Sequence, residues 1–256
     1  MVAGVIDRLR DGWTPEMIAG RSRVKAPGGL PYPVCPETIY QWIYSTEQTH
    51  RQLSQYLVRG HGRRKRRGGR RVRSVGIPFR VSMNQRPCLI DTREQFGHWE
   101  GDTVMGTKSA GGGIHTAVER VSRMLMARKV TRVTAQATST VQYHMFAGLP
   151  PWAARSVTVD NGSENALHYQ LDRLAMPVYF TDPYSSWQKG TVEHFNGRLR
   201  RYLPKGTDFT TITQDDLNDI VEAINNQPLK ILGWLTPAEV FHQLCSNPHA
   251  TVALQN

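Results

Sequence analysis

The 256-residue chain is predicted to be an α/β protein with a mixed sheet and flanking helices, preceded by a small all-helical region. Three observations predict this. The first 58 residues contain only short helical patterns, and residues 59–76 are rich in Arg and Gly. Residues 77–256 alternate strand-like and helix-like segments, which is typical of an α/β sheet. We therefore expect a helical region at 1–58, a flexible basic linker at 59–76 and a larger domain at 77–256.

Residues 1–58 are predicted to form several short helices. The segment VIDRLRDG ends at Gly12, a residue type that often follows the last turn of a helix. Thr14 can cap a second helix that has Pro15 at its first position. Pro36 opens a third, PETIYQWIYS, with apolar residues at helical spacing. Two such helices resemble a helix-turn-helix, whose second helix enters the major groove. They also fit an ordinary helical core, because the loop at 25–34 is long for that motif.

A further helix is expected at 46–58, and the basic linker follows it. The net charge of the chain is +11, and residues 59–73 hold nine Lys and Arg with no acid. Like charges and glycines oppose packing, which favours a flexible segment. Such a cationic run indicates a polyanionic partner, here double-stranded DNA, through counterion release; a solvated tail or targeting signal is the alternative. The expected contacts are Arg63, Arg64, Lys65, Arg66, Arg67, Arg70 and Arg71.

The three cysteines indicate the cellular compartment. Cys35, Cys88 and Cys245 lie far apart, without the paired spacing of a zinc site, and an odd number fits a reducing cytosol. No apolar run approaches the roughly 18 residues of a membrane span, and no signal peptide is visible at Met1. We therefore expect a cytoplasmic protein with no membrane partner.

The larger domain is predicted to contain five strands and three helices, in the order three strands, helix, strand, helix, strand, helix. Ser122 and Arg123 can turn a hairpin between the second and third strands, and an Asn-Gly turn follows the fourth. In the last helix, Val192, Phe195, Leu199 and Tyr202 recur at helical spacing as a buried stripe. The expected strands are 97–106, 111–121, 123–130, 156–160 and 177–182, and the expected helices are 134–149, 163–176 and 190–203.

Three acidic residues lie at the ends of these elements and predict a catalytic metal site. Asp102 lies late in the first strand, Asp160 ends the fourth, and Glu193 opens the last helix. Sites in open α/β sheets form outside the carboxyl ends of strands, so adjacent parallel strands would bring the two aspartates together. Clustered carboxylates repel unless cations bind, and Mg²⁺ prefers oxygen ligands. Two ions roughly 3.5–4 Å apart can assist an in-line displacement at phosphorus. Taken singly, each acid also fits a turn residue or a first-turn helix acid.

Other polar residues are weaker candidates. Glu100 shares the strand face of Asp102 and is either an auxiliary acid or the true first ligand. His98 is expected to contact DNA or a metal-bound water, or to be structural. Phosphate contacts are expected along and after the last helix, from Asn196, Arg198, Arg200, Arg201 and Lys205.

The segments GHWEGDTV, TVDNGSE and WQKGTVEHFNGRLRRYLPKGTDF closely resemble the DDE transposases of the insertion sequence 30 family. The segments DGWTPEMIAGRS, PETIYQWIY and TPAEVF are similar to that family too. The resemblance covers nearly the whole chain. It implies an RNase H-like catalytic domain in which Asp102, Asp160 and Glu193 bind two Mg²⁺ or Mn²⁺ ions. It also implies cleavage at transposon ends to free a 3′-OH, which then attacks target DNA, with assembly as a homo-oligomer on the DNA. The resemblance further implies a bacterial protein associated with the nucleoid.

The chain also departs from the family pattern. Members are usually longer, with another helix-turn-helix ahead of this chain's start, so Met1 is expected to mark a truncated gene. The family often has Asn in place of His194 and Arg in place of Gln227 and Leu229, changes expected to weaken DNA contacts. Two other functions stay open. One is a non-catalytic DNA-binding remnant that acts as a repressor, and the other is an RNase H-fold nuclease without strand transfer.

Overall fold

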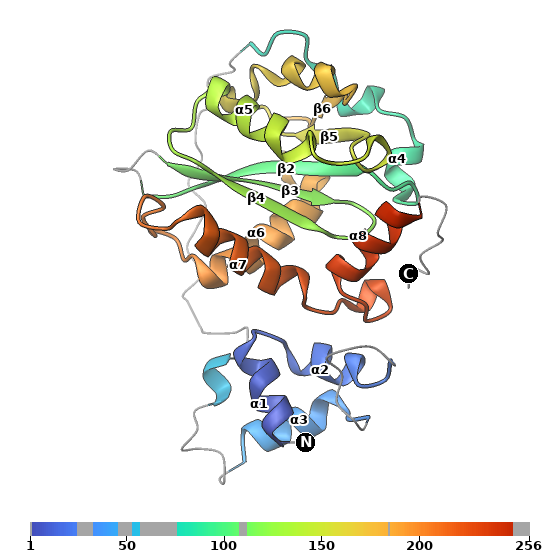
Figure 1. The fold of residues 1–256 in the computed structure, drawn as a ribbon, viewed down its shortest axis with the longest axis vertical. Helices are drawn as coiled ribbons and strands as arrows, with labels where there is room; N and C mark the ends of the chain where they lie inside the picture. The colour runs from blue at the N-terminus through green and yellow to red at the C-terminus, as the bar shows by residue number, and fades with distance from the viewer. Residues whose placement is uncertain are drawn as a thin grey trace. The chain divides into compact units, whose positions relative to one another are not determined.

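A computed structural model describes residues 2–24, 33–45, 53–56, 76–107, 112–183 and 185–247. The chain forms two compact units (Figure 1). The first contains residues 1–73, 226–240 and 251–256, and the second contains residues 74–225 and 241–250. The predicted linker lies outside the described residues except for Gly76, so the three-part division of the chain stays a prediction. Residues 226–240, which we expected in the larger domain, group with the first unit.

Three helices of the first unit overlap the expected segments, although the first begins three residues earlier, at Val2. They are α1 (Val2–Arg10), α2 (Pro15–Arg21) and α3 (Pro36–Ile43). Gly12 has a φ of 79°, the left-handed conformation that glycine adopts without strain. The Thr14 side chain accepts a hydrogen bond from the Met17 amide at 3.3 Å. Of the predicted helix at 46–58, the structure describes only a short 3-10 turn, η2 (Leu53–Tyr56).

A buried ion pair fastens residues 226–240 within the first unit. Arg21 is 2% exposed, and its guanidinium donates to both carboxylate oxygens of Glu239, at 2.9 and 2.5 Å, and to the Trp234 carbonyl at 2.9 Å. This bidentate geometry is the strong form of an Arg–carboxylate pair. The Trp234 ring lies so close to Gly20 that a Cβ there would be 2.0 Å from it. Only glycine fits at this position without a shift of the ring.

The second unit contains a six-stranded sheet in the order β1-β6-β5-β2-β3-β4. Strands β2, β3 and β4 pair antiparallel, whereas β2, β5, β6 and β1 pair parallel. This mixed sheet confirms the predicted RNase H-like α/β class and all five predicted strands. The sixth, β1, has only two residues, too few for a recognisable alternation. The strands are β1 (Val81–Ser82), β2 (His98–Met105), β3 (Gly113–Glu119), β4 (Leu125–Val130), β5 (Ser156–Val159) and β6 (Val178–Phe180).

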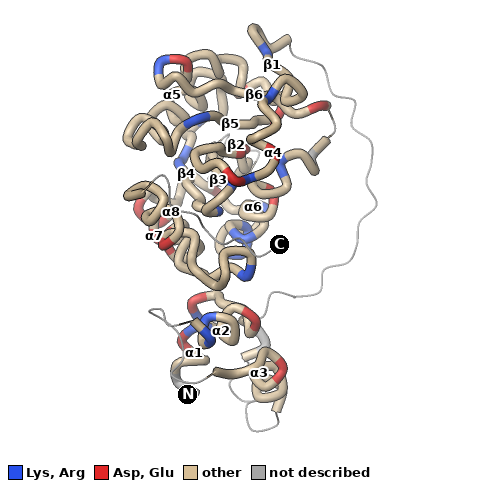
Figure 2. Tube along the Cα trace, turned by 90° about the vertical axis from the view of Figure 1, so that its right-hand side faces the viewer, with Lys and Arg blue, Asp and Glu red and all other residues tan. Residues whose placement is uncertain are grey.

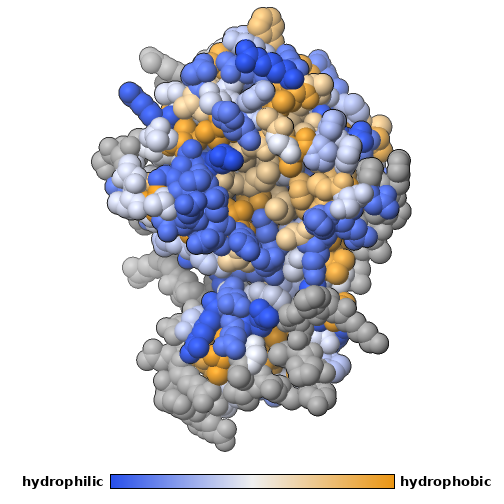
Figure 3. Space-filling model, viewed as in Figure 1, coloured by the Kyte–Doolittle hydropathy of each residue, from blue (hydrophilic) through white to orange (hydrophobic). Residues whose placement is uncertain are grey.

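Helices cover both faces of the sheet (Figure 1). Helix α5 (Ala135–Phe146) lies on one face, and α6 (Gly190–Tyr202) and α7 (Gln214–Asn225) lie on the other. All seven residues of β3 are therefore buried. Three members of the predicted stripe of α6 are buried, since Val192, Phe195 and Leu199 are at most 2% exposed, whereas Tyr202 at the end of the helix is only partly buried. The surface facing the viewer in Figure 3 mixes hydrophilic and hydrophobic residues, as expected when the large apolar side chains are mostly inside.

One predicted α-helix is wrong. Residues 163–176 form two 3-10 segments, η5 (Ser163–Asn165) and η6 (His168–Leu174). Side chains occupy carbonyls that an α-helix would use as acceptors: the Ser139 hydroxyl donates to Leu167 O at 3.3 Å, and the His168 ring bonds Asn165 O at 3.2 Å. The remaining short helices are η3 (Met83–Gln85), α4 (Leu89–Thr92), η4 (Pro151–Ala153), η7 (Ser186–Lys189), η8 (Lys230–Leu232) and α8 (Pro237–Ser246). None of the described helices has the length and apolar character of a membrane span.

Candidate active site

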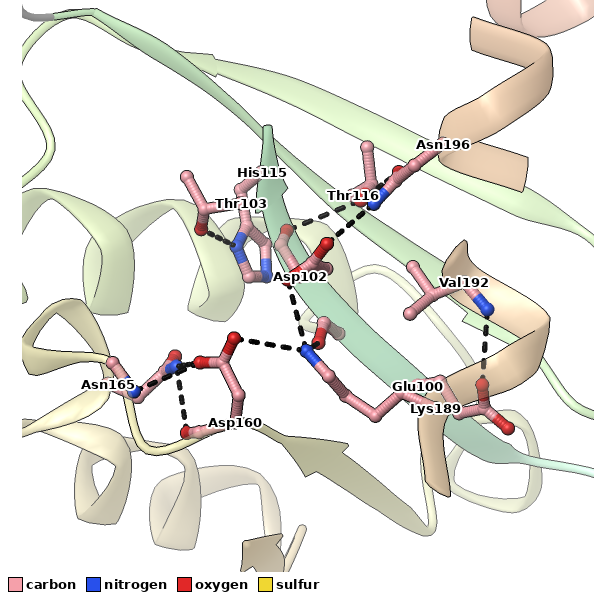
Figure 4. Close-up of polar contacts among 12 residues, drawn as sticks. Glu100, Asp102, Thr103, His115, Thr116, Asp160, Asn165, Lys189, Val192 and Asn196 are labelled. Carbon is pink, nitrogen blue, oxygen red and sulfur yellow. Dashed lines mark hydrogen bonds and ion pairs between the residues drawn. The ribbon is translucent and has the colours of Figure 1, made fainter. Parts of the chain in front are cut away.

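The pairing of β2 with β5 brings Asp102 and Asp160 together. The two strands run parallel, and Glu100 is the register partner of Thr158. Asp102 and Asp160 each follow this pair by two residues, so both side chains emerge on the same face of the sheet, just beyond the last register pair of β2 with β5. The expected convergence of these two aspartates is therefore seen in the structure (Figure 4).

Neutral donors hold one oxygen of each aspartate. Asn196 on α6 donates to Asp102 Oδ2 at 2.7 Å, and its own amide oxygen accepts from the Thr116 hydroxyl at 2.8 Å. Asp160 Oδ1 accepts from the Gly162 amide at 3.0 Å and from Asn165 Nδ2 at 3.2 Å. These bonds orient both carboxylates, so that the remaining oxygens, Asp102 Oδ1 and Asp160 Oδ2, face each other.

The ammonium group of Lys189 lies between those two oxygens (Figure 4). Its Nζ is 3.0 Å from Asp102 Oδ1 and 3.3 Å from Asp160 Oδ2, and it donates to Gly101 O at 3.2 Å. Lys189 is 4% exposed. Burial opposes its charge, but Asp102 and then Asp160 outweigh burial, so the pKa of Lys189 is raised. Sequence reasoning missed this residue. Helical spacing was the available signal, because Lys189 lies four residues before Glu193.

Glu193 lies on α6 between two residues that touch the aspartate pair. It follows Lys189 by four residues and precedes Asn196 by three, so helical periodicity places all three on one face of α6. Its side chain is exposed. Across the described ranges, no three His, Cys, Asp or Glu side chains lie close enough to hold a metal ion. Glu193 therefore lies close to the residues that contact Asp102 and Asp160, but its carboxylate does not join the two aspartates in this conformation.

Two further groups border the aspartates. His115 on β3 is buried, and its ring bonds the Thr103 hydroxyl at 3.1 Å and Gln142 Nε2 at 3.3 Å. Burial, followed by the charge of Lys189, lowers the pKa of His115 to about 4, so the ring is neutral at pH 7. Glu164 folds back over the turn after β5, where a Cβ on Gly162 would lie 2.4 Å from its carboxylate oxygens. Burial and then the charges of Asp160 and Asp102 raise the pKa of Glu164.

Glu100 is directed at the start of α6 and away from the aspartate pair. Its carboxylate is fully buried and accepts from the Thr191 amide at 2.9 Å, the Thr191 hydroxyl at 2.9 Å and the Val192 amide at 3.1 Å. Arg120 Nε lies 3.4 Å from the same group. A carboxylate at the amino end of a helix satisfies free N–H groups and favours the helix dipole. Glu100 therefore anchors the helix that carries Glu193, and neither of its oxygens faces Lys189.

His98 is likewise engaged inside the fold. Its ring nitrogens bond the Ser156 hydroxyl at 2.7 Å and Gln95 Oε1 at 2.8 Å. Burial, followed by the charge of Arg155, lowers the pKa of His98 to about 4. This arrangement favours the structural role over contact with DNA or a metal-bound water.

The basic candidates on and after α6 divide into two groups. Figure 2 shows basic positions near this helix. Arg198 is 6% exposed and stacks on the Phe195 ring at 5.2 Å, while Arg200 donates to the Met105 carbonyl at 2.6 Å. Arg201 and Lys205 are exposed on the surface. The linker candidates, Arg63, Arg64, Lys65, Arg66, Arg67, Arg70 and Arg71, lie outside the described residues.

The fold and the paired aspartates define an RNase H-like domain. The chain is 36% identical to the transposase for insertion sequence element IS4351 of Bacteroides fragilis, over 94% of this chain and 72% of that protein. It is also 36% identical to the transposase InsI for IS30C of Escherichia coli (strain K12), over 93% of this chain and 63% of that protein. The transposase for IS1086 of Cupriavidus metallidurans is 34% identical, over 98% and 75%. The chain therefore belongs to the insertion sequence 30 family of transposases.

The length of the relatives, the family models and the solved structures were also compared with this chain. The chain spans 63% of the length of the Escherichia coli relative. No family model matches it. Among solved structures, it is similar to the catalytic core domain of BIV integrase, with a TM-score of 0.47 and 18% identity, over 60% of this chain and 99% of that one.

Proposed function

We propose that the chain is a transposase that cleaves DNA at the ends of an insertion sequence and joins the freed 3′-OH to target DNA. The observation that carries this proposal is the convergence of Asp102 and Asp160 just beyond the paired stretch of two adjacent parallel strands, in a member of a transposase family. The substrates are double-stranded transposon ends and target DNA. Assembly of a homo-oligomer on DNA, in the cytoplasm of a bacterium, completes the proposal.

The donor set fits a divalent metal. Asp102 Oδ1 and Asp160 Oδ2 face one cationic group, and the other oxygen of each is already bound by neutral donors. Hard oxygen ligands of this kind are those that Mg²⁺ and Mn²⁺ prefer. Asp102, Asp160 and Glu193 would hold two such ions, Glu193 by turning inward from its exposed position on α6. When bound, the ions polarise the phosphodiester and stabilise the charge that develops on the attacking and leaving oxygens.

The side chains around the pair have separate tasks in this proposal. Asn196 and Asn165 keep the aspartate oxygens oriented. The neutral ring of His115 adds no positive charge behind the site. Arg201 and Lys205 contact DNA phosphates near α6, and the basic linker adds sequence-independent affinity. Water first attacks the phosphodiester at the transposon end, releasing a 3′-OH, and that hydroxyl then attacks a target phosphodiester. Neither step forms a covalent bond between protein and DNA.

Replacement of the three acids should abolish DNA cleavage and joining but leave the affinity for DNA unchanged. We expect Asp102→Asn, Asp160→Asn and Glu193→Gln each to abolish cleavage and joining, because these swaps keep size but remove the ligand charge. Each single change should cost nearly as much as all three together, because the ligands act as a unit. The assay uses labelled transposon-end DNA with Mg²⁺ or Mn²⁺, and binding is measured in parallel.

Asp219→Asn is the matched control, because Asp219 is an exposed carboxylate on α7; it should leave both steps unchanged. Substantial cleavage by a variant of the three acids would remove that residue from the mechanism. An unmutated chain that binds DNA but cleaves nothing would favour the repressor function. Cleavage without joining of a pre-cleaved end would favour a nuclease.

A further inference from the structure

Lys189 has no role in the site as proposed so far, yet its ammonium group lies at the centre of that site. All three of its N–H donors have acceptors: the Gly101 carbonyl, Asp102 Oδ1 and Asp160 Oδ2. An ammonium group has three donors and no acceptor, so its capacity is filled. It is among the most buried charged side chains of the second unit, at 4% exposure. A long flexible side chain loses conformational freedom in such a place, so its interactions must outweigh that cost.

The position of Lys189 Nζ conflicts with metal binding to the same oxygens. A divalent ion shared by Asp102 and Asp160 needs the two oxygens that Nζ now contacts, Asp102 Oδ1 and Asp160 Oδ2. The other two oxygens are bound by Asn196 and by Gly162 and Asn165. Two cations cannot contact one pair of oxygens without strong mutual repulsion. Lys189 must therefore leave before Asp102 and Asp160 can bind a metal ion together.

We propose that Lys189 is an internal counter-ion that holds the aspartate pair together before metal arrives, competes with divalent ions for Asp102 Oδ1 and Asp160 Oδ2, and is displaced when they bind. This inference rests on the proposed function only in placing the metal at the aspartate pair. Two neighbouring carboxylates repel when no cation is present. The buried ammonium removes that repulsion, so the site keeps its geometry while metal-free, at the cost of a weaker affinity for metal.

The same displacement accounts for the outward position of Glu193. Lys189 ends η7 and caps α6, so Lys189 and Glu193 occupy successive turns of one helix face. The single charge of the ammonium offsets only one of the two aspartate charges, so a third carboxylate is repelled by the remaining negative charge and stays in solvent. Departure of the ammonium together with arrival of two divalent ions reverses this balance, and Glu193 then gains favourable cation interactions by turning inward.

The first test measures metal affinity without catalysis. Lys189→Met keeps the apolar stem but removes the charge, and Lys230→Met, an exposed lysine of η8, is the control. Mn²⁺ binding is measured by titration calorimetry. In the native protein a divalent ion must displace the ammonium from two carboxylates at 3.0 and 3.3 Å. The lost attraction corresponds to at least about tenfold in affinity even in a water-like dielectric, so Lys189→Met should bind Mn²⁺ at least about tenfold more tightly. The variant should also unfold at a lower temperature in chelator and regain more stability with Mn²⁺. Equal or weaker binding by a folded Lys189→Met would overturn the inference.

The second test uses the unmutated protein and so does not depend on the folding of a variant. An amine-reactive reagent is added with chelator or with Mn²⁺, and modification of each lysine is measured by mass spectrometry. Lys189 should be protected in chelator and become modified in Mn²⁺, whereas Lys230 should react equally in both. Protection of Lys189 in saturating Mn²⁺ would contradict displacement. Loss of Mn²⁺ binding in Asp102→Asn, with no gain in Lys189→Met, would defeat this inference alone. Native Mn²⁺ binding by Asp102→Asn and Asp160→Asn would defeat the proposed function.

Discussion

Asp102 and Asp160 each divide their two oxygens between a neutral donor and the ammonium of Lys189. The neutral donors, Asn196 and Asn165, come from elements far apart in the chain, so orientation of the site depends on the whole second unit. His115 lies behind the pair with both ring nitrogens bonded. The site thus combines two carboxylates that a nearby cation stabilises with a histidine that burial keeps neutral.

The neutrality of His115 predicts acid sensitivity. Its pKa falls from 6.5 to about 4 on folding, so the unfolded chain binds the extra proton between these values. The stabilisation is complete above pH 6.5 and is lost as the pH falls towards 4. At about 1.4 kcal/mol per pKa unit, the loss is about 3 kcal/mol. Urea unfolding across this range should show a shallower pH dependence for His115→Gln than for the native protein.

The control for this measurement is His144→Gln, which replaces an exposed histidine of α5. Its unfolding free energy should follow the native pH dependence. Parallel curves for His115→Gln and the native protein would show that the His115 ring is not held neutral by the fold.

Among the elements, α6 decides the geometry of the site. Asn196 on this helix and Lys189 immediately before it contact the aspartate pair, and Glu193 lies between them in the chain. The buried stripe of Val192, Phe195 and Leu199 lies on the neighbouring face. The helix has no side-chain cap of its own, because its N-cap residue is Lys189. Glu100 on β2 instead accepts hydrogen bonds from the Thr191 and Val192 amides at the start of α6. The sheet therefore fixes where this helix begins.

Removal of the Glu100 charge should therefore weaken both stability and catalysis. In Glu100→Gln, an amide NH₂ group, which only donates, takes the place of one carboxylate oxygen that accepts hydrogen bonds from the start of α6. Arg120 also loses the negative charge beside it. A buried hydrogen-bond group left unsatisfied costs about 1–3 kcal/mol, which urea unfolding should detect. Cleavage should be slower but measurable, chiefly through kcat, because Glu193 lies in the first turn of α6 beside the altered hydrogen bonds, whereas Arg201 lies near the other end of the helix.

The exposed neighbour Glu94 provides the control. Glu94→Gln should match the native protein in unfolding free energy and cleavage rate. A Glu100→Gln variant with native stability and native kcat would show that the hydrogen bonds of Glu100 do not position α6.

For the whole molecule, the distribution of charge matters most. Residues 59–73 contribute nine of the eleven net positive charges, so the remainder of the chain is close to neutral. Replacement of Arg63, Arg64, Lys65, Arg66 and Arg67 by Ala should weaken binding to all duplex sequences alike. The slope of log affinity against log salt should flatten by roughly 0.9 for each DNA phosphate that the variant no longer neutralises.

A charge-conserving variant separates charge from side-chain shape. With the four arginines of this group changed to Lys, the number of cations is unchanged, and the salt slope should be close to native. A native slope in the Ala variant would show that this segment does not bind DNA.

The sequence by itself determined the fold class, the five longer strands, the three N-terminal helices and the family. These follow from local patterns: β-branched alternation, helical spacing and capping residues act over a few neighbours. The positions of Asp102 in a strand, of Asp160 directly after a strand and of Glu193 in the first turn of a helix could be read in the same way. The two-residue strand β1 and the 3-10 segments at 163–174 could not be predicted from the sequence. Pairing with β6 determines the conformation of β1, and side-chain contacts with α5 influence that of the 3-10 segments.

Only the tertiary structure decided what each polar group near the site does. Glu100 and Asp102 share one face of β2, yet one anchors the start of α6 and the other meets Lys189. Arg198 and Arg201 lie three residues apart on α6, yet one is buried against Phe195 and the other is exposed. A sequence shows that a charge is present, but its effect depends on burial and on partners brought from distant segments. Lys189 shows this most clearly, since its role follows from two carboxylates that lie 87 and 29 residues away in the chain.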